Sequence, residues 1–205
     1  MAQYFHIHPQ NPQSRLIKQT VQIIASGGVV VYPTDSYYAI GCHIGDKSAM
    51  DRIRRIRRLD EDHNFTLVSR DLSQISLYAK LENEQYRLIK AHTPGPYTFI
   101  LPATRQVPRR LQHPKRKTIG LRIPDSNIVS ALLLELGEPL MSSTLILPGE
   151  QVLSDPLDIR DRLECEVDLV VDGGYCGVEP TTVVEWLGDT PKITRIGLGD
   201  PAPFQ

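Results

Sequence analysis

A polar segment, Pro-Thr-Asp-Ser at positions 33–36, interrupts an otherwise apolar stretch of the chain. It places two hydroxyls and a carboxylate directly after a run of three valines, 29–31, which itself follows two glycines. Such a β-branched run is typical of a strand buried on both faces. Residues just beyond the carboxyl end of a strand lie where open α/β sheets bind ligands. Proline and aspartate are also ordinary turn formers, and this segment alone favours a turn.

Two stretches of the chain concentrate positive charge. The first, at 52–58, has two isoleucines at helical spacing and five arginines: Arg52, Arg54, Arg55, Arg57 and Arg58. A helix with this pattern has either a solvated cationic face or a surface for phosphate, because arginine pairs bidentately with phosphate oxygens.

The second cationic stretch, at 105–117, contains six basic residues and no acidic one: Arg105, Arg109, Arg110, Lys115, Arg116 and Lys117. Prolines at 108 and 114 favour a loop over a helix. The formal net charge of the whole chain is −1, so the surface potential must be strongly divided. The stretch is either an interface for RNA or nucleotide, or a charged loop without a partner.

Motifs for several common chemistries are absent. The chain has no GxxxxGK[ST] phosphate loop and no GxGxxG after a strand, which argues against a classical kinase and a Rossmann dehydrogenase. Its six histidines and three cysteines show no metal-ligand spacing, so we expect no metal site. A GxSxG nucleophile elbow is missing too, and Ser142 and Ser143 have no evident base nearby in the sequence.

The elements that must position these residues follow from hydrophobic periodicity. It predicts helices at 14–26, 46–58, 73–81, 83–92, 128–137 and 154–164, capped at their starts by Ser14, Asp46, Asn127 and Ser154 where a cap is evident. Strands are predicted at 29–32, 65–69, 97–103, 119–125, 139–147 and 167–174, with a terminal hairpin at 180–197. The segment around His6 is expected to be an exposed strand or a tail. Helices and strands alternate without a linker or repeat, which indicates a single α/β domain over 1–205 with a mixed sheet.

Composition adds limits of its own. Hydrophobic residues make up 40% and charged residues 23%, as in ordinary globular proteins. Three cysteines far apart in the chain and the lack of a secretory signal indicate a reducing compartment. No apolar run reaches the ~18 residues of a membrane span. We therefore expect a soluble cytoplasmic protein with no membrane partner.

Several segments, taken in order, resemble a known family. They are GGVVVYPTDSYYAIGC, AMDRIRRIRRLD, FTLVS, TPGPYTFILPA, GLRIPD, EPLMSSTLILPG and PTTVVEW. Over about residues 16–197 the chain resembles the YrdC/TsaC family of threonylcarbamoyl-AMP synthases, and within it the YciO branch. The resemblance implies a twisted open sheet with a concave cationic surface.

The resemblance also implies ligands and contacts. The family cavity holds ATP, threonine and bicarbonate, so ATP or AMP is an expected ligand, with Mg²⁺ if it is ATP, and no cofactor is bound tightly. Some members are associated with double-stranded RNA or tRNA. The implied substrate and nucleotide contacts are Thr34, Ser36, Arg57, Arg122, Thr144, Thr181 and Thr182. The cationic stretches supply the expected RNA contacts, which are Arg54, Arg55, Arg58, Arg109, Arg110, Lys115, Arg116 and Lys117.

Two motifs depart from the family pattern. Synthases carry Lys-x-Arg-Pro after the second helix, where this chain has Arg57 and Leu59, and Ser-x-Asn after a later strand, where it has Thr144 and Ile146. Leucine and isoleucine side chains donate no hydrogen bond. Removal of one donor to developing transition-state charge typically costs about 2.7–4 kcal/mol, so losing two would slow adenylation by about 10⁴-fold or more.

Four hypotheses remain open. The first is a protein that binds nucleotide and RNA while its synthase activity is weak or absent. The second is hydrolysis of threonylcarbamoyl-AMP or a related acyl-adenylate, which needs less stabilisation of pyrophosphate. The third is a functional synthase in tRNA modification, and the fourth is a paralogue with only a structural or docking role.

Overall fold

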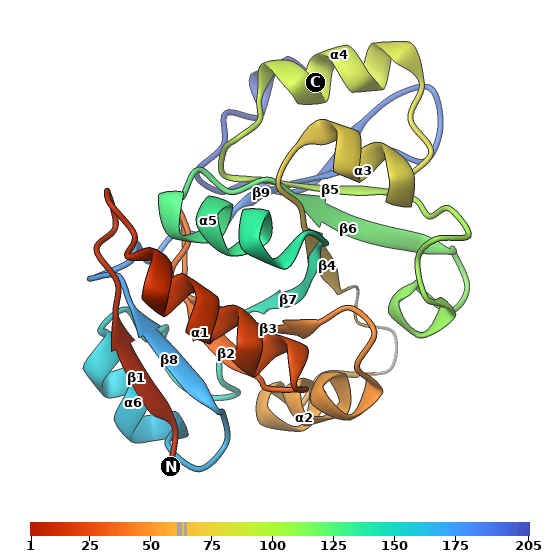
Figure 1. Ribbon diagram of the computed structural model, residues 1–205. Helices are drawn as coiled ribbons and strands as arrows, with labels where there is room; N and C mark the ends of the chain where they lie inside the picture. The colour runs from red at the N-terminus through yellow and green to blue at the C-terminus, as the bar shows by residue number, and fades with distance from the viewer. Residues whose placement is uncertain (61–62, 64) are drawn as a thin grey trace.

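The computed structural model describes residues 1–60, 63 and 65–205, which form a single α/β domain on a mixed, twisted open sheet (Figure 1). The strand order is β1-β8-β2-β3-β7-β4-β6-β5-β9-β10. The predicted fold class is confirmed. Within the described residues no helix is long and apolar enough to cross a membrane.

The bounds of the elements agree broadly with the predicted ranges. The strands are β1 (Gln3–His6), β2 (Val30–Tyr32), β3 (Ala39–His43), β4 (Thr66–Val68), β5 (Tyr97–Pro102), β6 (Thr118–Arg122), β7 (Leu140–Thr144), β8 (Leu169–Asp172), β9 (Thr182–Glu185) and β10 (Lys192–Arg195). The helices are α1 (Ser14–Ala25), α2 (Lys47–Arg57), α3 (Leu72–Tyr78), α4 (Asn83–Ala91), α5 (Asn127–Leu136) and α6 (Pro156–Leu163), with short 3₁₀ helices η1 (Arg109–Leu111) and η2 (Ala202–Phe204).

In the half of the sheet made by β1, β8, β2, β3 and β7, the strand β2 is buried on both faces. Val30 and Tyr32 pack in a cluster with α1 and α5, whereas Val29 and Val31 pack in a second cluster with α2 and α6. Figure 1 shows α1 and α5 side by side over this half. Because side chains alternate across a strand, the two clusters lie on opposite sides of β2. The predicted burial of this opening strand on both faces is confirmed.

The half made by β4, β6, β5, β9 and β10 has one apolar and one polar face. Phe99, Leu121 and Val184 lie side by side in the register of β5, β6 and β9, and they pack in the core with residues of α3 and α4. The neighbouring residue on each strand points the opposite way. That opposite face carries Thr98 and Arg122, which line a cavity.

The starts of α1, α5 and α6 differ from the predicted caps. Ser14 is the first helical residue of α1, so it is not the cap. Ser126 and Asp155 cap α5 and α6 in place of Asn127 and Ser154. Both capping residues have extended backbone, which turns the side-chain oxygen toward the free N–H groups of the first turn.

Hydrophobic periodicity does not predict the strand β3. Its residues Ala39 and Gly41 have low β propensity, yet the strand lies inside the sheet between β2 and β7. A Cβ on Gly41 would lie 2.9 Å from the carbonyl oxygen of Met141 and 3.0 Å from the ring of Tyr32. Close packing against the neighbouring strands therefore explains why a glycine stands here. The expected strand around His6 is present as β1, at one edge of the sheet.

Candidate ligand cavity and cationic surface

A cavity opens on the polar face of the sheet, near the junction of β7, β4, β6 and β5. It consists of two adjoining pockets, the larger of about 170 Å³, which share four lining side chains: Thr66, Thr98, Ser143 and Thr144. Arg122 lines one pocket, and Arg57 and Arg195 line the other. We call this space the arginine cavity. Guanidinium and hydroxyl groups on one wall suit an anionic ligand.

Arg122 ends β6 with its side chain 8% exposed, against the 33–36 segment. Its Nη2 donates to the hydroxyl of Ser36 at 2.9 Å and to that of Thr34 at 3.3 Å. The same nitrogen forms an ion pair with Asp35. The Nε of Arg122 is buried and has no hydrogen-bond partner among the described residues. The 33–36 segment is therefore more than a connecting turn, because it holds a buried arginine in place.

Arg195 reaches the cavity because β10 contains a bulge. Ile193 lies opposite Val184 of β9. Arg195, two residues later, lies opposite Val183, the immediate neighbour of Val184. The extra residue turns the Arg195 side chain to the polar face. There its Nε and Nη2 donate to the carbonyl and hydroxyl oxygens of Thr181 at 2.9 and 2.8 Å, and burial lowers its pKa.

No sequence pattern indicates Arg195 as a cavity residue. Strict alternation would place it on the same face as Ile193, with the core. A bulge becomes visible only in the pairing of the two strands, so alternation within β10 alone cannot reveal it.

Arg57 enters the cavity from the C-terminal end of α2. Its Nε donates to the carbonyl oxygen of Ile146 at 3.1 Å, and its Nη1 donates to the hydroxyl of Ser143. Burial lowers the pKa of Arg57 to about 10, so the side chain remains charged at neutral pH. Leu59, two residues further on, packs against the hydrophobic core.

His63 is a second cavity residue that the sequence reasoning misses. Its Nε2 lies 3.3 Å from the hydroxyl oxygen of Ser143, which is 80 residues away in the chain. Burial, followed by the charges of Arg57 and Arg54, lowers the pKa of His63 to about 4. The imidazole is therefore neutral at pH 7. Its separation from Ser143 in the sequence explains why no local motif connects the two.

The remaining predicted substrate contacts divide between the cavity and the core. Thr144 lines the cavity, and the Thr181 hydroxyl lies 2.9 Å from that of Thr98. Thr182 is fully buried, and its hydroxyl bonds to the backbone of the 197–199 segment at 2.6 and 2.9 Å. The structure thus leaves Thr182 out of the cavity. It brings together Thr34, Ser36, Arg57, Arg122, Thr144 and Thr181.

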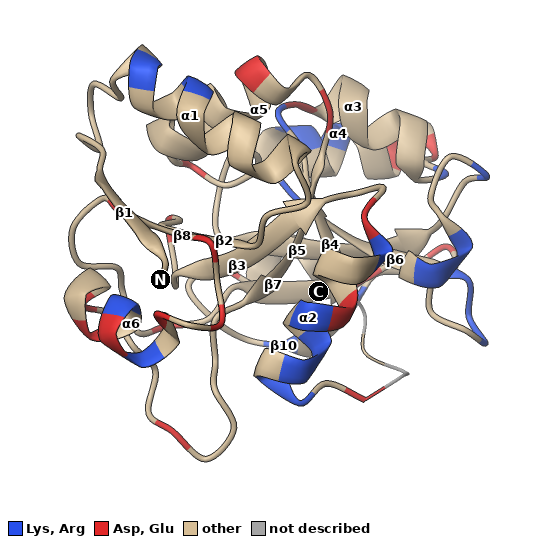
Figure 2. Cartoon of the chain, turned by 60° about the horizontal axis from the view of Figure 1, so that its bottom comes forward, with Lys and Arg blue, Asp and Glu red and all other residues tan. Residues whose placement is uncertain are grey.

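The second cationic stretch contacts the segment that precedes α2. Arg110 of η1 donates to the carbonyl oxygen of Gly45, which places the 105–117 segment beside the start of α2. Figure 2 shows Lys and Arg gathered on both in a single view. The exposed members of the predicted RNA contacts include Arg55, Arg58, Arg109, Lys115 and Lys117.

Other predicted RNA contacts have partners within the protein. Arg116 forms an ion pair with Glu185. The guanidinium of Arg54 lies over the ring of Phe65, 5.0 Å from its centroid. Both arginines would have to give up or share these contacts to bind a phosphate.

A cationic pocket of about 570 Å³ lies against the 105–117 segment. Its lining residues include four cations: Lys80, Arg105, Arg109 and Lys117. Within the described chain no acidic side chain lines it. Lys80 is not among the predicted contacts, because in the sequence it is more than 20 residues away from either cationic run.

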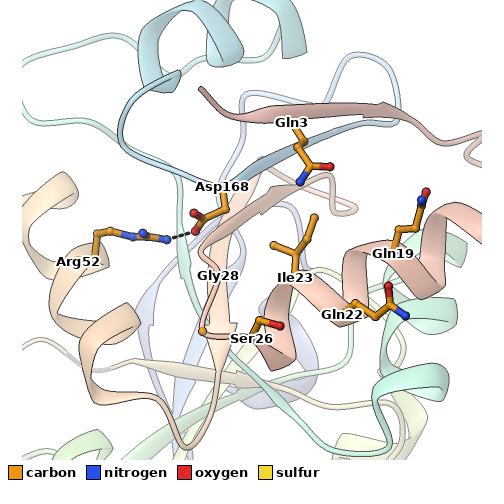
Figure 3. A pocket seen from close by; sticks show the side chains of 9 residues that line it. Gln3, Gln19, Gln22, Ile23, Ser26, Gly28, Arg52 and Asp168 are labelled. Carbon is orange, nitrogen blue, oxygen red and sulfur yellow. Dashed lines mark hydrogen bonds and ion pairs between the residues drawn. The ribbon is translucent and has the colours of Figure 1, made fainter.

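A pocket of about 590 Å³ lies between α1 and β1, as Figure 3 shows. The amides of Gln3, Gln19 and Gln22 line it, and an ion pair between Arg52 and Asp168 borders it. None of its described lining residues also lines the arginine cavity. With its charges paired, this pocket lacks the unbalanced positive charge of the arginine cavity. Because Arg52 is paired with Asp168, its charge is compensated within the protein and adds little to the cationic face of α2.

Comparisons with known proteins agree with the fold. The Sua5/YciO/YrdC family model, with the description "Telomere recombination", matches residues 22–197. The uncharacterized protein YciO of Escherichia coli is 57% identical over 205 residues, which cover 100% of both chains. Its crystal structure matches with a TM-score of 0.97. Threonylcarbamoyl-AMP synthase of Xanthomonas campestris pv. campestris is 31% identical over 176 residues, 84% of this chain and 94% of that protein.

A more distant structure shares the fold. The crystal structure of P. abyssi Sua5 in complex with L-threonine matches with a TM-score of 0.86 at 22% identity. The match covers 95% of this chain and 57% of that chain. At this identity the likeness concerns the fold alone.

Proposed function

This chain belongs to the Sua5/YciO/YrdC family, and from that premise we propose that it binds an adenine nucleotide or acyl-adenylate in the arginine cavity and RNA on its cationic surface. Its synthase activity is weak or absent. Threonylcarbamoyl-AMP, the product named for the X. campestris relative, is the model ligand.

The observation that carries the proposal is the convergence of Arg57, Arg122 and Arg195 on one hydroxyl-lined space. They come from α2, β6 and β10; Arg122 is buried, Arg57 is half-buried and Arg195 is more exposed, and nothing in the packing of the core requires the three guanidinium groups to meet. Among the described residues the buried Nε of Arg122 has no partner, and such a group normally finds a hydrogen bond. A phosphate or carboxylate supplies the missing acceptors and offsets the positive charge.

The weak synthase activity follows from two side chains. Leu59 is partly buried and packs against the core, and Ile146 presents its carbonyl oxygen to Arg57 while its own side chain offers no donor. Donors from other residues would have to stabilise departing pyrophosphate in place of these two side chains. The cavity keeps the residues for holding an adenylate but lacks these two for making it rapidly.

RNA binding is supported by the unpaired charge around η1. The cationic pocket lies on the segment that contacts the start of α2, because Arg110 donates to the carbonyl oxygen of Gly45. Neither cationic run contains a phenylalanine, tyrosine or tryptophan on which a base would stack. We therefore assign contacts to phosphates, which bind without strong sequence preference.

A ligand panel tests the proposal. Thermal unfolding is measured with AMP, ATP with Mg²⁺, L-threonine and threonylcarbamoyl-AMP. A ligand at 100 times its dissociation constant stabilises the folded state by about 2.7 kcal/mol, which raises the midpoint by several degrees. We expect stabilisation by the adenylates. If none of the four shifts the midpoint, the cavity does not bind this class of ligand.

A further inference from the structure

The end of β7 places a serine against a histidine and an arginine. Ser142 bonds to the Tyr32 hydroxyl, 2.6 Å away, and lines one pocket of the arginine cavity. Ser143 points to the opposite side of β7 and lines both pockets. The Ser143 hydroxyl oxygen lies 3.3 Å from Nε2 of His63 and accepts a hydrogen bond from Nη1 of Arg57. A serine oxygen that accepts from arginine has its proton available for the histidine.

The surroundings of His63 keep it ready to accept a proton. Its ring lies edge-on to Phe65, with 5.5 Å between ring centroids. The charged groups around it are Arg54 and Arg57 of α2, which oppose protonation, and Asp60, which favours it. The neutral form therefore predominates at physiological pH. An anionic ligand in the cavity would partly offset the two arginines and strengthen the base once substrate is bound.

We propose that Ser143 is a nucleophile and His63 its general base, and that together they hydrolyse the acyl–phosphate bond of an acyl-adenylate held in the arginine cavity. This inference rests on the proposed function, since it requires the adenylate to bind there. It names a reaction and two catalytic residues for a site otherwise described only as a binding site.

The first half of the reaction transfers the acyl group to the enzyme. The Oγ of Ser143 attacks the carbonyl carbon, and the hydroxyl proton passes to Nε2 of His63. The bond from the carbonyl carbon to the phosphate oxygen breaks, and its electron pair leaves with AMP. His63 then releases its proton to solvent. Arg57 stabilises the developing negative charge on the serine oxygen.

The second half frees the serine. Water attacks the carbonyl carbon of the seryl ester, and His63 accepts a proton from the water. As the bond to Ser143 breaks, that proton returns to its Oγ. The sum is one acyl-adenylate plus water giving one free acid and AMP. For a threonylcarbamoyl group the free acid is a carbamate.

Two features favour hydrolysis over synthesis at this site. AMP leaves with its charge on one phosphate, so the reaction does not depend on the donors missing at Leu59 and Ile146 for stabilising pyrophosphate. In addition, Arg57 already bonds to the serine oxygen and to the Ile146 carbonyl. It is placed to act on the nucleophile.

The test compares Ser143→Ala and His63→Gln with the parent and with Ser69→Ala, a buried serine outside the cavity whose hydroxyl has no partner among the described residues. AMP release from preformed threonylcarbamoyl-AMP is followed by chromatography. We expect a loss of about 100-fold or more in each of the first two variants, a typical value for removal of a general base. The Ser69→Ala variant should keep the parent rate.

Binding and pH dependence separate this inference from the proposed function. AMP should still bind to both catalytic variants, as measured by calorimetry. In the parent, kcat/KM should fall only as pH approaches the His63 pKa of about 4, and His63→Gln should abolish this acid limb. A parent that fails to bind AMP and threonylcarbamoyl-AMP refutes the proposed function. A parent that binds them, with parent-like turnover in Ser143→Ala or His63→Gln, refutes only the nucleophile–base pair.

Discussion

Arg122 and Asp35 show how a single residue pair joins stability to ligand binding. Their side chains are 8% and 12% exposed, so each depends on the other for compensation of a buried charge. An incoming anion would compete with Asp35 for the guanidinium. The pair therefore holds the arginine in place before the ligand arrives and limits how strongly it binds the ligand.

Asp35→Asn tests that dependence. Leaving a buried charge without its partner costs about 3–5 kcal/mol. The free energy of unfolding of the variant should therefore be lower than that of the parent by a large part of this amount. AMP should then stabilise the variant more than the parent, because the nucleotide supplies the missing anion. Urea unfolding with and without AMP measures both effects, and Asp161→Asn, at an exposed position, is the control. An equal effect of AMP on parent and variant would show that Arg122 does not contact the ligand.

His63 gives the fold a pH dependence of its own. Its folded-state pKa of about 4 lies below the unfolded value of 6.5, so stability is fully present above pH 6.5 and is lost as pH falls toward 4. The unfolded chain binds the proton first. His63→Gln should flatten the stability profile between those two pH values, as measured by urea unfolding at fixed ionic strength. An unchanged profile would place the imidazole in a more solvated setting.

Among single residues, sequence reasoning succeeds where a side chain follows a strand. Thr34, Ser36 and Arg122 stand at strand ends in motifs that resemble a known family, and the structure brings them together. Arg195 and His63 lie outside such motifs. One depends on a bulge and the other on a contact over 80 residues, and neither leaves a periodic signal.

Helices and strands with strong periodicity are predicted well, and those shaped by close packing are not. The amphipathic pattern locates α1 and α2, but β3 is hidden by its small residues Ala39 and Gly41. The caps of α5 and α6 are each displaced by one residue. Good capping residues stand side by side at both starts, Ser126 and Asn127 at α5 and Ser154 and Asp155 at α6.

The adjacency of α2 and η1 predicts how RNA binds. Arg109→Glu combined with Lys115→Glu should weaken binding of duplex RNA or tRNA and flatten its salt dependence, by about 0.9 in log-log slope for each duplex phosphate that the protein no longer neutralises. Arg15→Glu with Lys18→Glu on α1 makes the same change in net charge on another element. Fluorescence anisotropy over a salt series measures the slopes. If both double variants weaken binding equally, net charge and not the η1 surface controls binding.

The molecule as a whole divides its sheet between stability and ligand binding. The half around β2 forms much of the core on both of its faces, whereas the polar face of the other half, together with the end of β7, forms the arginine cavity. YciO of E. coli, at a TM-score of 0.97 and 57% identity, has the same overall fold. The fold therefore leaves the activity to the few side chains that line the cavity.

Turnover of the whole protein tests the loss of synthase activity. With ATP, Mg²⁺, L-threonine and bicarbonate, pyrophosphate release should be about 10⁴-fold slower than for the X. campestris synthase, because two donors are missing. Leu59→Arg combined with Ile146→Asn should raise the rate by more than the product of the single effects if both donors act on one transition state. Thermal unfolding checks that the variant is folded, since Leu59 contacts the core. Equal rates in the parent and the synthase would refute the argument from missing donors.

The dissociation constant of AMP, measured by calorimetry, tests the central claim that the arginine cavity is the ligand site. Arg195→Ala removes one cation, and the double variant Asp35→Ala/Arg122→Ala removes another without leaving a buried charge unpaired. Removing one hydrogen bond to a charged group should weaken binding by about 10- to 150-fold. Arg87→Ala, at an exposed position on α4, should bind AMP as the parent does. If AMP binds to the parent, and the two cavity variants bind it equally well, the ligand lies elsewhere and the account of this site is wrong.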